Sequence, residues 1–294
     1  MSATSPTAEP SVIRGRIGCD ARSGHYPVPR RYRLHLSPSC PYCLQIAVTH
    51  SLLELGDALP VTLLPAVPDA PEGGYTALRP LYEASSHHYP GPVLAPVLSD
   101  TWTGRLVSTY APDILLDLAE RFGGAAPALR PRGTEREIDE LTRLCEQDIN
   151  QSARRAGRRD ADCATRDSAL RTLFRALDTL EEQLAGRAYV LGDDGPTAAD
   201  VQVWVALLLL DTVHRPHLGA AAAQCVADYP NLWAYAERLS AHREFGAQLH
   251  LDAIQQRHHT HHGCPPHTDT TTLVDWAAHE TRYAPAGSPV ESGC

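Results

Sequence analysis

The sequence predicts a small α/β unit followed by an all-α unit. Up to residue 123, short runs with β-type alternation are interspersed with helical stretches, and their order is β-α-β and then β-β-α. Such an order gives a small mixed sheet with helices on its faces. A Pro/Gly-rich linker at 124–133 follows, and beyond it the apolar residues recur with the helical period.

The first strand and helix follow an N-terminal stretch, residues 1–30, that lacks periodicity and is expected to be an extended arm. Residues 31–37 alternate apolar and polar side chains, which predicts a strand. Pro41 suits the first turn of a helix, which is expected to run to Leu55 and to end at Gly56.

The rest of the α/β unit is expected to contain three strands and one helix. The strands are expected at 61–67, 93–98 and 106–108, with Pro- and Gly-rich loops after the first of them, and the helix at 112–123. Pro96 interrupts the second of these strands. Because proline cannot donate to a sheet ladder, the Ala95–Pro96 bond is a candidate cis peptide.

The all-α unit is expected to contain helices at 134–156, 165–185, 197–213 and 229–243. Thr197 and Asp200 have the spacing of a capping box at the start of the third helix. This helix is apolar almost all round, which is typical of the buried centre of a helical unit. The residues from 248 onward read as a tail that is first His-rich and then rich in Pro and Ser.

The composition excludes several classes of protein. The net charge is −9, which argues against a nucleic-acid partner. No apolar run is long enough to cross a bilayer and the N-terminus has no signal-type apolar stretch, so we expect a cytoplasmic protein without membrane contact. The eight cysteines fit cytosolic thiols better than a secreted disulfide scaffold. The absence of lysine beside abundant Ala and Arg is typical of the GC-rich coding that is frequent in actinomycetes.

One cysteine pair points to thiol chemistry, because Cys40-Pro41-Tyr42-Cys43 lies between a predicted strand and a predicted helix. This is the C-x-x-C context of thioredoxin-like folds. A cysteine in the first turn of a helix meets free backbone N–H groups and the positive end of the helix dipole, and both favour the reactive thiolate. A zinc site at this pair is not favoured, because no second pair with suitable spacing exists. Cys40 is therefore the candidate nucleophile.

Beyond this motif, the chain resembles the Xi class of the glutathione transferase superfamily, the glutathionyl-hydroquinone reductases, over about residues 30–262. The Cys40 segment is similar to the class's stretch that ends in a catalytic Cys-Pro-Trp. Further similar segments follow in the same order and spacing: Leu81-Tyr82, Tyr89-Pro-Gly91, Ala95-Pro-Val-Leu98, Asp100, Ile149-Asn150, Arg155-Ala-Gly157, Leu191-Gly-Asp193, Thr197-Ala-Ala-Asp200, Asp211, His217 and Tyr229-Pro-Asn-Leu-Trp233. The resemblance rests on the shared order and spacing of these segments, because each segment alone is too short to be specific.

The resemblance implies a thioredoxin-like domain at 31–123 and a helical glutathione transferase-type domain at 134–247, with the arm at 1–30 and the tail at 248–294. It implies that Cys40 attacks the sulfur of a thiol adduct and forms a mixed disulfide, which a second thiol resolves. It further implies a homodimer, no tightly bound cofactor, and a low-molecular-weight thiol as co-substrate beside a small electrophile. The residues expected to hold the thiol are Pro41, Tyr42, Ala95, Pro96, Val97, Tyr110 and Ala111.

Several positions depart from the glutathione-binding pattern of the class. Glutathione transferases hold the γ-glutamyl end with an acidic or amide residue followed by serine, whereas this chain has Tyr110-Ala111 there, and Pro92 replaces an arginine. Each lost charge-assisted contact is worth about 1.5–3 kcal/mol, so glutathione binding is expected to weaken by orders of magnitude. We expect mycothiol, which suits the actinomycete-like composition, or ergothioneine, whose trimethylammonium group could face Tyr110 by cation–π attraction. The alternative for Tyr110 is a surface aromatic without a ligand.

The substrate-pocket residues also differ from the class. A class tyrosine that assists quinone reduction is replaced by Arg154, and another falls near His258 or His259. We expect these three residues to border the substrate pocket, with a histidine as acid or base near neutral pH. The competing interpretations of the late segment are a metal site formed by His258, His259, His261 and His262, and a solvated tail without a role.

Three functions remain open from the sequence. The first is an enzyme, a thiol S-transferase that joins a small thiol to an electrophile or removes one from a conjugate, as a glutathionyl-hydroquinone reductase does. The second is a dithiol oxidoreductase like a glutaredoxin, in which Cys43 resolves the mixed disulfide. The third is a non-catalytic thiol-binding protein of the same fold. We favour the first, with Cys40 at the active site.

Overall fold

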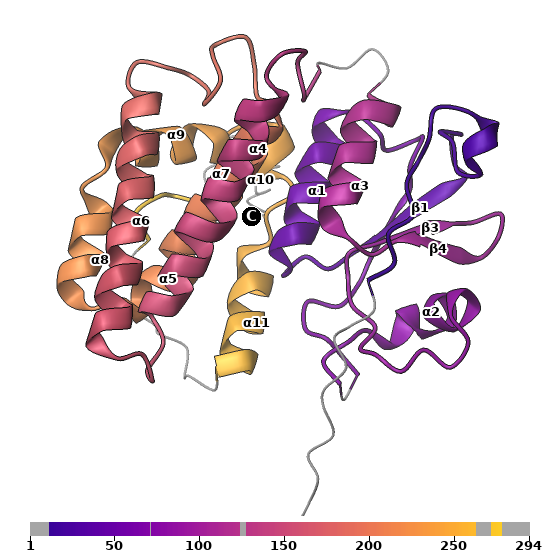
Figure 1. The fold of residues 1–294 in the computed structure, drawn as a ribbon, viewed down its shortest axis with the longest axis horizontal. Helices are drawn as coiled ribbons and strands as arrows, with labels where there is room; N and C mark the ends of the chain where they lie inside the picture. Colours follow the sequence, from indigo (N-terminus) through magenta and orange to yellow (C-terminus); the bar gives the residue numbers. More distant parts are fainter. Residues whose placement is uncertain (1–11, 71, 124–127, 263–271, 278–294) are drawn as a thin grey trace, which may run out of the picture.

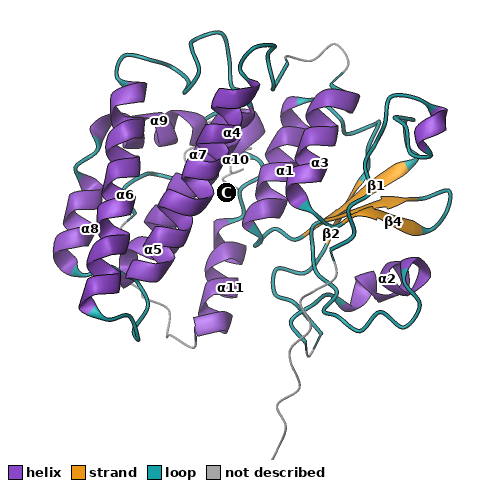
Figure 2. Ribbon diagram, viewed as in Figure 1, coloured by secondary structure: helices purple, strands orange, loops and turns teal. Residues whose placement is uncertain are grey.

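A sheet-containing half and a helical half lie side by side in the computed structural model, which describes residues 12–70, 72–123, 128–262 and 272–277 (Figure 1). Within these ranges, the four strands lie in the first half, and helices make up the second (Figure 2). This arrangement confirms the predicted fold class.

The sheet has the strand order β2-β1-β3-β4. Strand β1 (Tyr32–Leu36) pairs parallel with β2 (Val61–Leu63) and antiparallel with β3 (Val97–Asp100), and β3 pairs antiparallel with β4 (Arg105–Ser108). The helices α1 (Pro41–Leu52) and α3 (Ala111–Asp117) pack together on one side of the sheet, and α2 (Arg79–Ser85) lies on the other (Figure 1). The sheet and α1 thereby set the position of the Cys40 segment, which joins them.

Several element boundaries in this half differ from the predicted ones. The helix expected to reach Leu55 ends at Leu52, because the chain turns at Glu54, which has a φ of 52°. The Ala95–Pro96 peptide is cis, as predicted, and β3 begins only after it and extends to Asp100. The strand expected at 61–67 ends at Leu63, and α2 occupies a stretch that was expected to be a loop. Pro80 stands in the first turn of α2, where proline is tolerated, so the prolines of that stretch did not exclude a helix.

Part of the N-terminal arm forms an additional edge beside β4. The amide of Gly15 donates to the carbonyl of Val107 at 2.8 Å, and Arg14 forms an antiparallel bridge with Ser108. A Cβ on residue 15 would overlap the Val107 carbonyl oxygen, so this close approach requires glycine. Arg14 also binds Asp113 in the first turn of α3 with two hydrogen bonds, of 2.8 and 2.9 Å. The arm is thus fixed to both the sheet and α3.

The helical half contains more elements than the sequence predicted. Helices α8 (Ala220–Ala227) and α11 (Leu251–His262) were not predicted as helices, the second because its run of histidines was assigned to a tail. The other elements of this half are α4 (Glu135–Arg143), α5 (Gln151–Ala156), α6 (Cys163–Leu184), α7 (Ala198–Leu209), α9 (Pro230–Ser240) and α10 (Arg243–Gly246), with π-helical segments at 144–150 and 210–214 and a 3-10 turn at 215–217. The sheet-containing half has a π-helical segment at 118–122 and 3-10 turns at 21–23 and 76–78.

The buried helix α7 begins with the predicted capping box. The Asp200 carboxylate accepts hydrogen bonds of 2.8 Å from both the backbone amide and the hydroxyl of Thr197. Its other oxygen accepts from the Val190 amide and the Tyr235 hydroxyl, each at 2.9 Å. Asp200 is fully buried, so these four donors depend on a single carboxylate for their partner.

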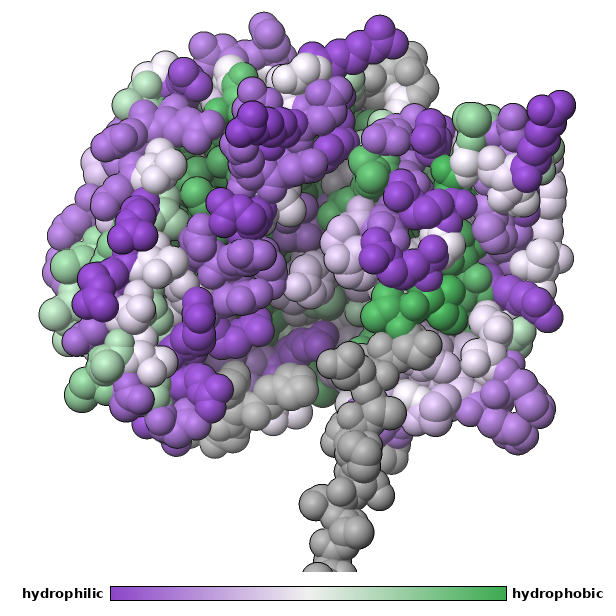
Figure 3. Space-filling view, viewed as in Figure 1, coloured by the Kyte–Doolittle hydropathy of each residue, from purple (hydrophilic) through white to green (hydrophobic). Residues whose placement is uncertain are grey.

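The face shown in Figure 3 is mainly hydrophilic over the helical half, whereas apolar side chains gather on the sheet-containing half. Leu63 in the edge strand β2 is the most exposed of the large aliphatic side chains, at 66%. Among the described helices, none has the length and hydropathy of a segment that crosses a membrane.

Replacing Asp200 with asparagine tests the importance of the capping box. The amide nitrogen would replace an acceptor that faces two donors, so we expect Asp200→Asn to lower the free energy of unfolding by about 2–4 kcal/mol. Urea unfolding followed by circular dichroism measures this change. Asp167→Asn on the exposed surface of α6 is the matched control and is expected to change stability by less than about 0.5 kcal/mol. Equal stabilities of the two variants would contradict the role assigned to Asp200.

Candidate active site

Cys40 lies at the junction between the sheet and α1, as the N-cap residue of that helix. Its amide donates to the Ser37 carbonyl at 3.2 Å, and its carbonyl accepts from the Leu44 amide at 2.9 Å. Pro41 supplies the first helical residue and has no amide hydrogen that would need a partner. The strand, the turn and the proline therefore place the Cys40 side chain at the positive end of α1.

The thiol of Cys40 is activated by its surroundings. Hydrogen bonding from Cys43 lowers the pKa of the Cys40 thiol to about 7, and the backbone amides of Cys43 and Tyr42 and the charge of Arg257 add to this against the opposing effect of burial. Burial, followed by the interaction with Cys40, raises the pKa of the Cys43 thiol well above its ordinary value. With a pKa of about 7, Cys40 is present in part as the thiolate near neutral pH, and Cys43 is the protonated donor.

Cys40 lines a cavity of about 750 Å³ between the two halves of the molecule. Its volume is within the range of small-molecule sites. The start of α1, the end of α5, the segment after α7 and the helix α11 form its walls, with these lining residues: Ser39, Cys40, Pro41, Tyr42, Ala153, Arg154, Gly157, Arg158, Arg159, Leu209, Val213, His214, His217, Ile254, Arg257 and His258. A ligand in this cavity would contact the nucleophile and the helical half together.

Arg257 on α11 connects the last described helix to the Cys40 segment. One guanidinium nitrogen lies 3.4 Å from the Ser39 hydroxyl and 3.3 Å from the Tyr75 hydroxyl. Ser39 is held in turn by the Ser37 hydroxyl at 3.1 Å and by the Ala66 carbonyl. The positive charge of Arg257 thus lies beside the thiolate without a carboxylate partner among the described residues.

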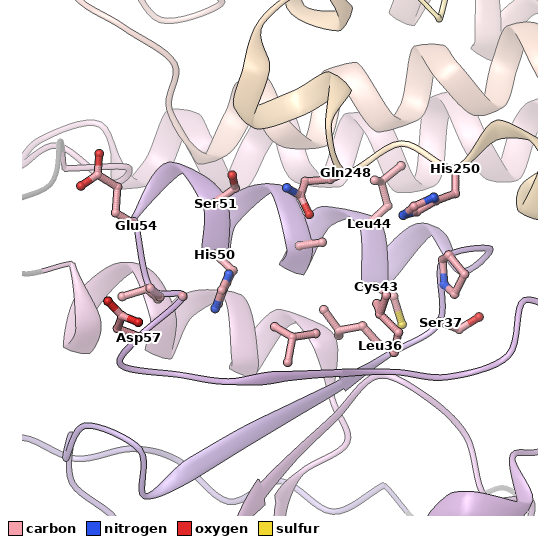
Figure 4. A pocket seen from close by; sticks show the side chains of 16 residues that line it. Leu36, Ser37, Cys43, Leu44, His50, Ser51, Glu54, Asp57, Gln248 and His250 are labelled. Carbon is pink, nitrogen blue, oxygen red and sulfur yellow. The ribbon is translucent and has the colours of Figure 1, made fainter. Parts of the chain in front are cut away.

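Cys43 borders a different cavity from Cys40. This second cavity, of about 640 Å³, lies along α1 and β2, and the Cys43 side chain lies beside Leu36 and Ser37 in it (Figure 4). His50 and the pair Gln248 and His250 stand around the same space (Figure 4). The two thiols of the motif therefore contact each other but border separate cavities.

The structure brings together only some of the predicted site residues. Pro41, Tyr42, Arg154 and His258 line the Cys40 cavity with the nucleophile. The other predicted thiol-binding residues do not line it: Ala95, Pro96, Val97, Tyr110 and Ala111. Their role in thiol binding stays a prediction.

Tyr110 is the N-cap residue of α3 and has a cationic neighbour already. The guanidinium of Arg14 lies 4.2 Å from the centre of its ring, while the same group binds Asp113. A ligand cation would have to use the other ring face or displace Arg14. This contact argues against the predicted cation–π site for a trimethylammonium group at Tyr110.

The histidine-rich segment contributes one described side chain to the site. The Nε2 atom of His258 lies 2.7 Å from the Nε2 atom of His217, and both rings line the Cys40 cavity. The side chains of His259, His261 and His262 lie outside the described residues, as do Cys264 and His267. Within the described part of the chain, no three His, Cys, Asp or Glu side chains gather as a metal site, and the metal hypothesis stays a prediction.

Sequence reasoning missed several residues of the cavity, above all Arg257. It lies 218 residues from Ser39 in the chain, and no local pattern relates the two. A helical period through residues 251–262 was the available signal, because Leu251, Ile254 and His258 recur at helical spacing. His214 and the arginines that follow α5 were missed for the same reason, since only the packing of the helices brings them to Cys40.

The comparisons with known proteins agree with this geometry. Residues 151–238 match the family model described as the glutathione S-transferase C-terminal domain. Glutathionyl-hydroquinone reductase PcpF from Sphingobium chlorophenolicum is 27% identical, with coverage of 88% of this chain and 86% of that protein. A glutathione transferase structure from Gordonia bronchialis is 28% identical with a TM-score of 0.74, covering 86% of this chain and 83% of that one. A Xi-class structure from Natrialba magadii is 25% identical with a TM-score of 0.75, covering 89% and 85%. The chain therefore has the glutathione transferase fold, carries that superfamily's C-terminal domain, and resembles its Xi class.

Proposed function

We propose that the chain is a thiol-dependent transferase that removes a small thiol from a thioether conjugate through a mixed disulfide at Cys40. The observation that carries this proposal is the Cys40 thiolate, with its pKa lowered to about 7, which opens into a cavity of about 750 Å³. The similarity to a protein named glutathionyl-hydroquinone reductase supports the direction of the reaction. A cytoplasmic homodimer is part of the same proposal.

The proposed reaction has two displacement steps. The Cys40 thiolate attacks the sulfur of a conjugate R–S–Ar, so that an S–S bond forms and the S–C bond breaks. The electron pair remains on the aromatic carbon, which takes up a proton and leaves as ArH. A second thiolate RS⁻ then attacks the sulfur of the R group in the mixed disulfide, and RS–SR and the Cys40 thiolate are released. The two electrons gained by the aromatic product come from the two thiols.

We further propose that the thiol is not glutathione. The positions that correspond to the γ-glutamyl contacts of glutathione transferases are Tyr110, which offers no carboxylate or amide group, and Ala111, which lacks the serine hydroxyl. The nearby carboxylate of Asp113 already binds Arg14. Mycothiol is the favoured alternative. Ergothioneine is expected to place its trimethylammonium group against the Tyr110 ring, but Arg14 already occupies one face of that ring.

A glutaredoxin-like dithiol reaction is the second candidate function. The contact between the Cys40 and Cys43 thiols favours it, because a neighbouring thiol is positioned to attack a mixed disulfide at Cys40. The high pKa of the Cys43 thiol disfavours it, since the protonated thiol is a poor nucleophile.

A single-turnover experiment tests the proposed function. Wild-type protein is mixed with a glutathionyl or mycothiolyl conjugate of a hydroquinone, and mass spectrometry follows both the protein and the released hydroquinone. We expect one thiol-sized adduct on the Cys40 peptide per hydroquinone released, and neither product with Cys40→Ser. In the dithiol candidate, Cys43 displaces the bound thiol from the wild-type protein and leaves a Cys40–Cys43 disulfide, while Cys43→Ser retains the adduct; an adduct that persists on wild-type Cys40 contradicts that candidate. Release of hydroquinone by Cys40→Ser would contradict both candidates.

The pH dependence of alkylation tests the activation of Cys40. Only the thiolate reacts with iodoacetamide, so the rate at the Cys40 peptide should rise through a midpoint near pH 7. We expect Cys43→Ala to move this midpoint upward by about one unit, because the main donor to the thiolate is lost. Cys43→Ser retains a hydroxyl donor and should stay closer to the wild type. Mass spectrometry must resolve the peptides, because Cys19, Cys163 and Cys225 are exposed. An unchanged midpoint in Cys43→Ala would rule out Cys43 as the activating donor.

A thermal-shift screen tests the identity of the thiol. Glutathione, mycothiol and ergothioneine are compared at equal concentrations, since a ligand that binds the folded state raises the melting temperature. We expect mycothiol to give the largest shift and glutathione little or none. Tight binding of glutathione alone would overturn the proposal of another thiol, but it would leave the reaction at Cys40 intact.

A further inference from the structure

The cavity in front of Cys40 is lined by basic side chains and contains no carboxylate among its lining residues. Four arginines and three histidines border it, on α5, on the segments after α5 and α7, and on α11: Arg154, Arg158, Arg159, Arg257, His214, His217 and His258. This concentration contrasts with the whole chain, whose net charge is −9. A cationic cavity in an anionic protein attracts anions locally, because close charges dominate over distant ones in a screened medium.

Two of these arginines keep their charge available to a ligand. Arg257 contacts the hydroxyls of Ser39 and Tyr75, which are neutral. Arg154 forms no ion pair within the described part of the chain and lies beside Tyr42, whose hydroxyl donates to Glu146 at 3.3 Å. Arg158 differs, because its guanidinium binds Asp160 at 2.6 and 2.9 Å. The positive charge available to a ligand is therefore assigned to Arg154 on α5 and Arg257 on α11.

The remaining lining of the cavity is suited to an aromatic or aliphatic body. Leu209, Val213, Ile254 and Pro41 contribute apolar side chains, and the Tyr42 ring also lines the cavity. Sites for small ligands combine such an apolar lining with a few polar groups that orient the ligand. Here the orienting groups are cationic, which selects for the opposite charge on the ligand.

We propose that the Cys40 cavity selects aromatic substrates that carry an anionic substituent, a carboxylate or a sulfonate, held by Arg154 and Arg257. This proposal rests on the function proposed above and names the class of its electrophilic partner. The guanidinium groups would hold the anion by charge-assisted hydrogen bonds, and the apolar wall would hold the ring. The anion would also orient the ring with respect to the Cys40 thiolate, so selectivity should appear in binding as well as in turnover.

Matched ligands without a reactive group test the proposal. We would measure the binding of 2-naphthoate and of its neutral analogue 2-naphthamide to the reduced protein by calorimetry. We expect naphthoate to bind at least about tenfold more tightly than naphthamide. This ratio of Kd values corresponds to a difference in binding free energy of about 1.4 kcal/mol. Arg154→Gln and Arg257→Gln should each reduce this preference to about threefold or less. Arg171→Gln, which removes an exposed arginine of α6 that does not line the cavity, is the control and should retain the full preference.

Protection of Cys40 locates the binding site. Naphthoate should slow the alkylation of Cys40 by iodoacetamide in proportion to its occupancy, whereas naphthamide at the same concentration should protect much less. A second pair, 3-mercaptopropionate and 2-mercaptoethanol, carries the carboxylate on the thiol instead of the ring. A preference in this pair alone would assign the cations to the thiol and overturn the proposal for the aromatic partner.

Two further outcomes would also overturn the proposal. One is equal affinity for naphthoate and naphthamide in the wild type, and the other is naphthoate binding that leaves the alkylation of Cys40 unchanged. Both are independent of the proposed reaction, because mixed-disulfide formation at Cys40 is measured with a separate substrate. A protein that fails the single-turnover experiment but shows the naphthoate preference would retain an anion-selective cavity without the proposed chemistry.

Discussion

The arrangement of the molecule depends on the packing of α1 into two cores at once. Leu44 and Val48 belong to the apolar core of the helical half, whereas Cys43 and Ile46 belong to the core below the sheet. The helix packs on both α3 and α7, with apolar side chains facing each of the two cores. Because both halves pack against the same helix, they meet at its start, and this is where Cys40 lies.

This constraint accounts for a Cys40 thiol that is buried and still has a lowered pKa. Burial in a junction between two cores raises the pKa of a thiol, as it does for Cys43. At Cys40 the hydrogen bond from Cys43, the free amides at the helix start and the charge of Arg257 outweigh that effect. Cys43 and the backbone amides belong to α1, whereas Arg257 belongs to α11, which contributes because it packs against the junction. The reactivity of Cys40 is thus a property of the assembled halves.

The cavity shows a similar division between scaffold and specificity. The start of α1 supplies the thiol, while α5, α11 and the segments after α5 and α7 supply the groups that a substrate would meet. The N-terminal arm acts on the other side, where Arg14 binds Asp113 and covers one face of Tyr110. In the proposed function, selectivity for the substrate is therefore set by the helical walls, while the strand, the turn and the thiol of the Cys40 segment supply the scaffold.

The sequence by itself determined the fold class, the Cys40 motif, the cis Ala95–Pro96 bond and the capping box of Asp200. These features depend on residues that are close in the chain, so periodicity, proline chemistry and capping patterns are sufficient to find them. Helix α11 was missed because its histidines resemble a tail, and its pairing of His258 with His217 appears only in the packed structure. Only the tertiary structure decided that Arg257 lies beside Cys40, that Arg154 and Arg257 share one cavity, and that Cys43 borders another. The physical reason is that these contacts join residues far apart in sequence, and side-chain packing between the two halves determines which of them meet.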